Sequence, residues 1–309
     1  MHEFDLIREY FIWSTNQASV VLGVGDDGAI CDIESGYQLV SSIDTLIAGV
    51  HFPQTTSAAD VAHKALAVNL SDIAAMGALP KYYTLALTLP EVNQPWLRDF
   101  SQSLKQLSKQ FNISLIGGDT TKGNLSITIS IMGWIESGKA LRRSGAQIGD
   151  GVYVSNTLGS AAFALWQLNN NEVPDVTNLK SLNRPIPQLE LGRSLQGIAS
   201  ACIDISDGLE QDLSHILVAS NVGAVIEVEK LPINRVLAKR ILKDGDYSLP
   251  LNGGDDYELC FTVPEKNQAM LGDIAKHCGI KITQIGVICA SGGLEIVGAK
   301  NIGESYQHF

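Results

Sequence analysis

The sequence has few aromatic and few charged residues for its length. Among 309 residues, aromatic side chains make up 6% and charged side chains 18%, whereas hydrophobic residues make up 45%. Low charge with high apolar content excludes a disordered chain. At roughly 150 residues per domain, the length predicts two domains, each large enough to fold without disulfide or zinc stabilisation.

The cysteines are odd in number, form no C-x-x-C pair and lie mostly in apolar runs: Cys31, Cys202, Cys260, Cys278 and Cys289. This pattern is typical of reduced thiols in a cytoplasmic protein. No stretch approaches the roughly 18 consecutive apolar residues that a membrane span needs. The first ten residues contain acidic side chains at helical spacing, unlike a signal peptide. We therefore expect a cytoplasmic protein with no membrane partner.

Basic residues are also scarce, because 22 Lys and Arg stand against 33 Asp and Glu, a net charge of −11. Such a charge repels a phosphate backbone, so nucleic acid is not an expected partner. The sequence lacks a Walker loop and the spaced aspartates of a calcium loop. Residues 23–28 (GVGDDG) match G-x-G-x-x-G, but the strand-like residues 29–31 follow where a dinucleotide-binding fold needs a helix.

Hydrophobic periodicity predicts two series of strands and helices. In the first half we expect strands at 37–47, 83–89 and 125–131 and helices at 61–75 and 95–111, which together form a mixed α+β domain. In the second half we expect strands at 152–154, 201–203 and 224–228 and helices at 160–168, after Pro187 and from Asp207, which form a layered α/β domain. The turn-rich residues 138–151 separate the halves, and the predicted domains are 1–140 and 141–309.

Many of the acidic residues lie at glycine-rich junctions, at 23–28, 117–121, 204–208 and 253–258. A single Gly-Asp pair is most often an ordinary turn, so the interpretation depends on the group. Adjacent carboxylates repel each other unless a cation lies between them, and Mg²⁺ is the cation that suits oxygen ligands.

Asp72 lies on the apolar stripe of its predicted helix, because steps of four and three residues lead to it from Val61, Ala65 and Val68. A buried carboxyl must be protonated, paired or metal-bound. The alternative is that the buried face of the helix ends near Ser71. Asp44 lies within an apolar strand, so the pattern alone also leaves open whether its carboxyl is buried and how its charge is compensated. Arg143, beside Arg142, is a candidate phosphate contact, and ordinary surface charge is its alternative.

Taken together, eight segments closely resemble the thiamine-monophosphate kinase family: GDD at 25–27, SID at 42–44, NLSDIAAMG at 69–77, GGDTT at 117–121, RSG at 143–145, DISDGL at 204–209, GGDDYELC at 253–260 and YQHF at 306–309. That family belongs to the ATP-binding superfamily of aminoimidazole ribonucleotide synthase. The resemblance implies an N-terminal ATP- and Mg²⁺-binding domain whose sheet pairs with its copy in a homodimer. It also implies a C-terminal domain that completes the active-site cleft.

The resemblance further implies the roles of individual residues. The implied Mg²⁺ ligands are Asp27, Ser42, Asp44, Asp72, Asp119, Asp204 and Asp207. The implied ATP contacts are Gly118, Asp119, Arg143 and Ser206, and the implied thiamine-phosphate pocket contains His51, Asp255 and Tyr306. The chain departs from the family twice, with Ile43 where Thr is frequent and Asp255 where Glu is frequent. Ile43 offers a metal only its backbone carbonyl, and Asp255 has the shorter side chain.

The implied reaction transfers the γ-phosphoryl group of ATP to thiamine monophosphate, with several Mg²⁺ ions and no catalytic acid or base. Three alternatives stay open on the sequence: a superfamily synthase with another acceptor, a metal-dependent phosphohydrolase, and a non-catalytic cation-binding protein. The last gives no role to Arg143.

Overall fold

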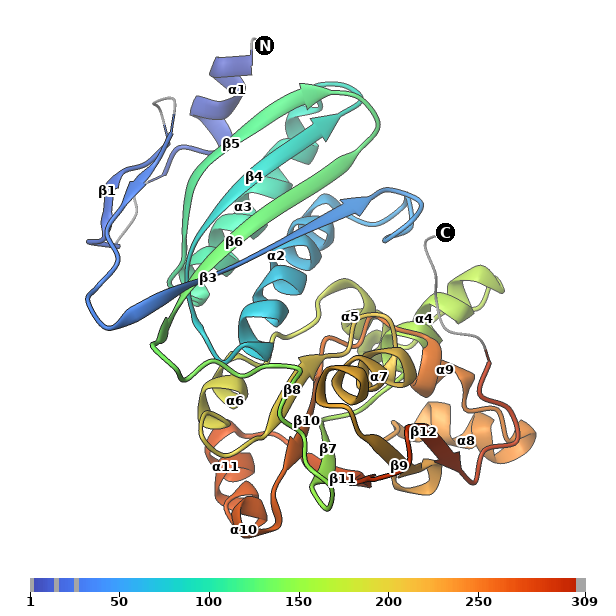
Figure 1. Cartoon of the computed structure of the whole chain (residues 1–309). Helices are drawn as coiled ribbons and strands as arrows, with labels where there is room; N and C mark the ends of the chain where they lie inside the picture. The colour runs from blue at the N-terminus through green and yellow to red at the C-terminus, as the bar shows by residue number, and fades with distance from the viewer. Residues whose placement is uncertain (1–2, 14–16, 25–27, 304–309) are drawn as a thin grey trace. The chain divides into compact units, whose positions relative to one another are not determined.

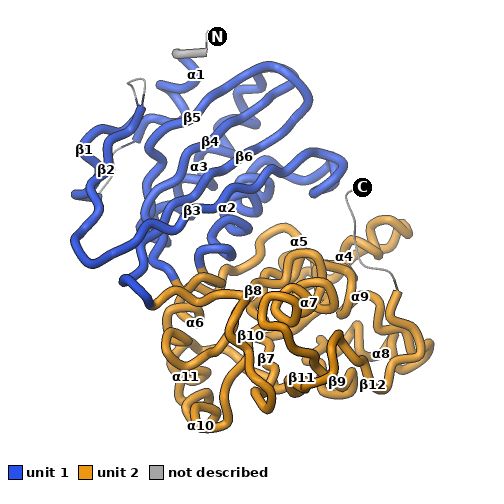
Figure 2. Tube along the Cα trace, in the orientation of Figure 1, with its two compact units in different colours: residues 1–73, 78–138 blue, residues 74–77, 139–309 orange. Residues whose placement is uncertain are grey.

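A computed structural model describes residues 3–13, 17–24 and 28–303 of the chain. The chain divides into two compact units, residues 1–73 with 78–138, and residues 74–77 with 139–309 (Figure 2). No helix in the described ranges has the length and apolar character needed to cross a membrane.

The first unit is a four-stranded sheet with helices on one face (Figure 1). The strand order is β3-β6-β4-β5, in which β4 and β5 are parallel and the other pairs antiparallel. Its elements are α1 (Glu3–Tyr10), β1 (Val20–Leu22), β2 (Ile30–Cys31), β3 (Tyr37–Ile47), α2 (Ala58–Ala75), β4 (Leu79–Leu89), α3 (Gln94–Gln110), β5 (Ser114–Lys122) and β6 (Ser126–Glu136). The last residues of α2 belong to the second unit.

Helices α2 and α3 cover one face of this sheet, and the side chains on that face are buried. β6 alternates with period two, so that Ile127, Ile129 and Ile131 are buried. Tyr83 of β4 is fully buried, and its hydroxyl hydrogen-bonds the Ser108 hydroxyl of α3 at 2.7 Å. The expected mixed α+β domain is therefore present.

The second unit is a six-stranded sheet with helices on both faces, in the order β12-β9-β11-β7-β10-β8. Its elements are β7 (Gly151–Ser155), α4 (Ser160–Asn169), α5 (Val176–Asn183), α6 (Leu189–Ser194), β8 (Ala201–Asp204), α7 (Leu209–Ser220), β9 (Gly223–Glu227), the 3₁₀ helix η1 (Val228–Lys230), α8 (Arg235–Asp244), α9 (Ser248–Asn252), β10 (Leu259–Val263), α10 (Glu265–Gln268), α11 (Leu271–Cys278), β11 (Ile282–Cys289) and β12 (Gly293–Val297).

Two apolar clusters lie on opposite faces of this second sheet. One joins Leu213 of α7 to Ile203 and Ile226, and the other joins Leu191 of α6 to Phe261. Neighbouring residues of one strand point to opposite faces, so β8 and β10 contribute to both clusters. The layered α/β domain expected from the sequence is confirmed.

One of the four expected glycine-rich junctions is a strand instead. Residues 117–121 lie within β5, a strand that the hydrophobic periodicity did not indicate. A Cβ atom on Gly118 would stand 2.0 Å from the Leu85 carbonyl oxygen of β4. Glycine is required here because two parallel backbones approach closely, and no turn is formed.

A second close approach generates a prediction for stability. Gly223 begins β9, and a Cβ on it would stand 1.5 Å from the Ser291 carbonyl oxygen. We expect Gly223→Ala to lower the free energy of unfolding by about 2–3 kcal/mol, because backbone must move to admit the methyl group. Urea denaturation measures the change.

Gly272 of α11 provides the control, because a Cβ atom on it would meet nothing within 4 Å beyond the backbone of its own helix. Gly272→Ala should raise the free energy of unfolding by about 0.5–1 kcal/mol, since alanine favours the helix. Equal stability of the two variants would contradict this account of Gly223.

Candidate functional site

In the first unit, Ser42 and Asp44 of β3 meet Asp72 of α2. Strand alternation places Ser42 and Asp44 on the same face as Leu46, whose side chain is buried. The Ser42 hydroxyl donates a hydrogen bond to Oδ2 of Asp72 at 2.5 Å. The structure thus brings together three of the predicted metal ligands, and the helical spacing that singled out Asp72 did identify a partly buried, paired carboxyl.

The electrostatics of this cluster are those of two carboxyls that compete for one proton. The pKa of Asp44 is raised to about 7, first by burial and then by repulsion from Asp72 and a hydrogen bond with it. All three side chains offer oxygen only, which is the donor set that a hard divalent cation prefers. A cation would replace the shared proton, so these residues fit Mg²⁺. Within the described ranges, no three Asp, Glu, His or Cys side chains by themselves form a metal-binding group.

Gly118 and Asp119 lie on β5, at the opposite edge of the sheet from Asp44. Two strands, β6 and β4, separate β5 from β3, which corresponds to roughly 14 Å at the usual strand spacing. Asp119 is exposed and lines a small cavity with Gly118, Ile7 and Phe11. Asp119 is therefore separate from the Asp44 cluster.

His51 follows β3 in a short loop that fixes its ring. The Ile47 amide donates to Nδ1 of His51 at 3.0 Å, so the neutral ring carries its proton on Nε2. The buried Lys64 side chain donates to the His51 carbonyl oxygen at 3.1 Å. Two further predicted residues, Asp27 and Tyr306, lie outside the described residues.

In the second unit, Asp204 is the last residue of β8, and Ser206 and Asp207 lie in the short loop that leads from β8 to α7. Asp204 is buried at the end of β8. Asp207 is half-buried, and its Oδ2 accepts a hydrogen bond from the Gln211 side chain at 2.8 Å. Arg143 lies in the preceding 139–150 segment with an exposed side chain, and its carbonyl oxygen accepts a hydrogen bond from the Ser220 hydroxyl.

The loop of Asp255 is hydrogen-bonded directly to the loop of Ser206. The Asp255 amide donates to the Ser206 carbonyl at 2.8 Å, and the Tyr257 amide donates to the Ile205 carbonyl at 2.8 Å. Asp255 has a left-handed backbone with φ of 62°, and its carboxylate accepts a hydrogen bond from the Tyr257 hydroxyl at 3.1 Å. Backbone hydrogen bonds therefore join the loop of Ser206, a predicted ATP contact, and Asp207, a predicted metal ligand, to the loop of Asp255, a predicted substrate contact.

Three further carboxyls in this unit were not predicted as site residues. Burial raises the pKa of Asp212 and that of Glu258 to about 7 each, and it raises the pKa of Asp256 well above its usual value. Hydrogen bonds from backbone amides oppose the shift of Asp212, and Gly159 opposes that of Asp256. The only sequence signal for Asp212 was its place four residues after the Asp204–Gly208 turn, where a carboxyl can reach back to free amides.

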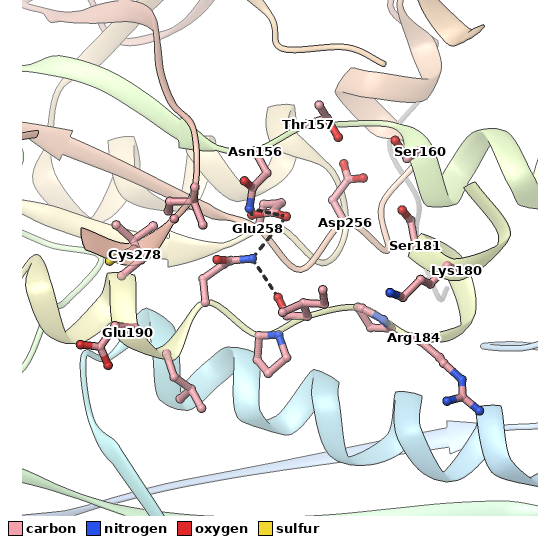
Figure 3. A pocket seen from close by; sticks show the side chains of 18 of the residues that line it. Asn156, Thr157, Ser160, Lys180, Ser181, Arg184, Glu190, Asp256, Glu258 and Cys278 are labelled. Carbon is pink, nitrogen blue, oxygen red and sulfur yellow. Dashed lines mark hydrogen bonds between the residues drawn. The ribbon is translucent and has the colours of Figure 1, made fainter. Parts of the chain in front are cut away.

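Asp256 and Glu258 line a cavity of about 530 Å³ in the second unit (Figure 3). The Glu258 carboxylate accepts hydrogen bonds from Ser155 and Asn156, and Figure 3 shows the Asn156 and Glu258 side chains facing each other. Lys180 lines the same cavity. Of the site residues predicted from the sequence, none within the described ranges lines it.

Proteins of known name match almost the whole chain. The chain is 46% identical to thiamine-monophosphate kinase of Haemophilus influenzae, over 93% of this chain and 89% of that protein. The chain belongs to the thiamine-monophosphate kinase family. Residues 25–135 match the N-terminal domain of AIR synthase related proteins, and residues 147–299 match the C-terminal domain.

Solved structures of the thiamine-monophosphate kinase family share the whole fold. The enzyme from Stenotrophomonas maltophilia K279a superposes with a TM-score of 0.87 at 40% identity, covering 97% of this chain and 96% of that one. A structure described as AaThiL complexed with AMPPCP and TMP superposes with a TM-score of 0.79 at 29% identity, covering 99% and 96%.

The Asp44 cluster generates a prediction for stability without metal. Folding raises the pKa of Asp44 from 3.8 to about 7, so between these values the folded state binds more protons than the unfolded state. The free energy of unfolding therefore falls as the pH rises through this window. Asp44→Asn removes the effect, so its stability should exceed that of the wild type by about 4 kcal/mol near pH 8 and match it near pH 3.

Denaturant unfolding in the presence of a chelator measures this difference. Added Mg²⁺ should stabilise the wild type more than Asp44→Asn, because the cation needs both carboxylates. If Asp44→Asn is no more stable than the wild type near pH 8, then ionising Asp44 beside Asp72 does not destabilise the folded state.

Proposed function

We propose that this chain transfers the γ-phosphoryl group of ATP to the phosphate of thiamine monophosphate, with formation of thiamine diphosphate and release of ADP. The observation that carries the proposal is the oxygen-only cluster of Ser42, Asp44 and Asp72 in a chain of this family. The relative complexed with AMPPCP and TMP supports both an ATP-like co-substrate and a second, phosphorylated ligand.

The chemistry of this transfer explains why the candidate site is acidic. The acceptor is a phosphate oxygen that is already anionic, so no general base is needed. The obstacle is repulsion between two polyanions, which carboxylates alone would worsen. Mg²⁺ bound at the site would neutralise this charge and align the reacting phosphates. The residues that would hold several such ions are Asp27, Ser42, Asp44, Asp72, Asp119, Asp204 and Asp207.

The remaining residues of the proposal bind and orient the two substrates. Gly118, Asp119, Arg143 and Ser206 contact ATP, and the apolar side chains of Ile7 and Phe11 beside Gly118 suit the uncharged part of a nucleotide. For thiamine monophosphate, His51 presents Nε2–H as a donor, while Asp255 presents a carboxylate at a fixed backbone angle. Tyr306 completes this pocket.

We also propose that two copies of the chain pair through the first unit. β3 is an edge strand of eleven residues, and Leu39, Ile43 and Ile47 on its outer face are exposed. A long edge strand with an exposed apolar face favours association with another strand. In this arrangement residues 1–140 bind ATP and Mg²⁺ and form the dimer, and residues 141–309 complete the site. The absence of a cysteine pairing pattern favours the reducing cytoplasm.

The test of the activity is mass spectrometry of the products from purified protein, ATP, Mg²⁺ and thiamine monophosphate. Thiamine diphosphate formed in step with ADP, and only with the monophosphate, is the expected result. ADP released without an acceptor would favour a phosphohydrolase, and ADP without a phosphorylated thiamine would favour a synthase with another acceptor.

Asp72→Asn tests the metal cluster within this reaction. We expect kcat to fall by about 100-fold at limiting Mg²⁺, because the amide keeps the shape of Asp72 but removes the charge that binds the cation. The matched control is Asp273→Asn on the surface of α11, which should turn over like the wild type. Near-normal turnover of Asp72→Asn would remove Asp72 from the ligand set.

Leu39→Lys tests the dimer. A charge on the outer face of β3 should shift the protein to the monomer in analytical ultracentrifugation, since the exposed apolar face would no longer pair. Leu242→Lys on α8 places the same charge at a residue that is 86% exposed and should not change the mass. A dimer that survives Leu39→Lys would place the interface elsewhere.

A further inference from the structure

Asp212 makes an unusual set of contacts in the second unit. It lies in the first turn of α7 and is buried. One of its oxygens, Oδ2, accepts hydrogen bonds from three successive backbone amides, those of Ser206 at 2.9 Å, Asp207 at 3.1 Å and Gly208 at 3.1 Å. A single carboxylate oxygen therefore fixes the direction of three peptide groups.

These bonds stabilise the loop more than the helix. The free amides of a helix belong to its first turn, which here begins at Leu209. Gly208 is the residue that caps this turn, whereas Ser206 and Asp207 precede it. A carboxyl that served only the helix would not need to reach the amides of Ser206 and Asp207.

The three bonds also orient the groups on the other side of the loop. The Asp207 amide points toward Asp212, so the Ser206 carbonyl, which belongs to the same trans peptide group, points the other way and accepts the Asp255 amide at 2.8 Å. Gly254 lies against this carbonyl, since a Cβ on it would stand 2.6 Å from the Ser206 oxygen. A shift of the Ser206 peptide would therefore displace the Asp255 loop as well.

We propose that Asp212 is a positioning residue for the phosphoryl transfer, one that holds Ser206 and Asp207 toward the nucleotide and its metal and, through the Ser206 carbonyl, holds Asp255 toward the acceptor. This inference rests on the proposed function. Its distinctive consequence is that one side chain that binds neither substrate controls the use of both.

The test compares three substitutions that separate geometry from charge. Asp212→Asn keeps an oxygen that can accept the same three amides but removes the charge. Asp212→Glu keeps the charge but moves the oxygen by one methylene. Asp212→Ala removes the acceptor. If the geometry of the loop is what matters, Asn should retain activity within about threefold, while Glu and Ala should lose about 10–100-fold in kcat/KM for both ATP and thiamine monophosphate.

Asp175→Ala is the matched control, because its carboxylate also accepts two backbone amides, of Thr177 and Asn178, at the start of α5. This variant should lose stability without the loss in either kcat/KM. If Asp212→Ala does not fold, the contrast between Asn and Glu decides the question. Full activity of Glu together with loss of activity in Asn would overturn the proposal, because charge would then matter and position would not.

Two measurements do not depend on turnover. Hydrogen exchange of the amides of residues 206–208 should accelerate in Asp212→Ala and Asp212→Glu but not in Asp212→Asn. Calorimetric binding of AMPPCP with Mg²⁺ should weaken in the same two variants. If the wild type binds this nucleotide but forms no thiamine diphosphate, the proposed function fails while exchange and binding still test the role of Asp212. Unchanged hydrogen exchange and unchanged AMPPCP binding in Asp212→Ala would refute the positioning role of Asp212.

Discussion

The free-energy cost of removing carboxylates from water, and of holding some of them close together, is the constraint on which both groups of candidate residues depend. Asp44 lies beside Asp72 in the first unit, and in the second unit Asp212 is buried while Asp256 and Glu258 are partly buried. Ionising such groups costs free energy that hydrogen bonds offset only in part. A protein that binds anionic substrates gains from this arrangement when cations take the place of the missing protons.

The fold offsets this free-energy cost differently in the two units. In the first unit, Asp72 accepts a hydrogen bond from Ser42 and shares a hydrogen bond with Asp44, and a metal could replace the proton between the two carboxyls. Asp212 receives three amides, and Glu258 receives a hydroxyl and a side-chain amide. These carboxyls accept hydrogen bonds from groups of the protein itself. We interpret the first kind as ligands and the second kind as supports for loops that carry ligands.

Local patterns in the sequence could predict the environment of a residue where that environment depends on the residue's own helix or strand. The position of Asp44 within an apolar strand and the helical spacing of Asp72 were enough to raise the question of whether these carboxyls are buried. The exchange of hydrogen bonds between the Ser206 and Asp255 loops joins residues about fifty positions apart, and no periodicity reports such a pairing. The prediction of a junction at residues 117–121 was wrong for a related reason, because glycine marks a turn and a close strand contact equally well. The assignment of roles came from resemblance to a family, and the structure alone would not have supplied it.

The left-handed backbone of Asp255 gives a physical meaning to one departure of this chain from its family. Aspartate and asparagine tolerate positive φ better than residues with longer side chains, because their short polar groups can hydrogen-bond locally. Here the Asp255 carboxylate does so with the Tyr257 hydroxyl. The resemblance to the family led us to expect glutamate here, and the shorter aspartate has less reach toward a ligand but suits this main-chain conformation better. The side chain at this position therefore has to balance an unstrained backbone against length, and the two cannot both be maximised.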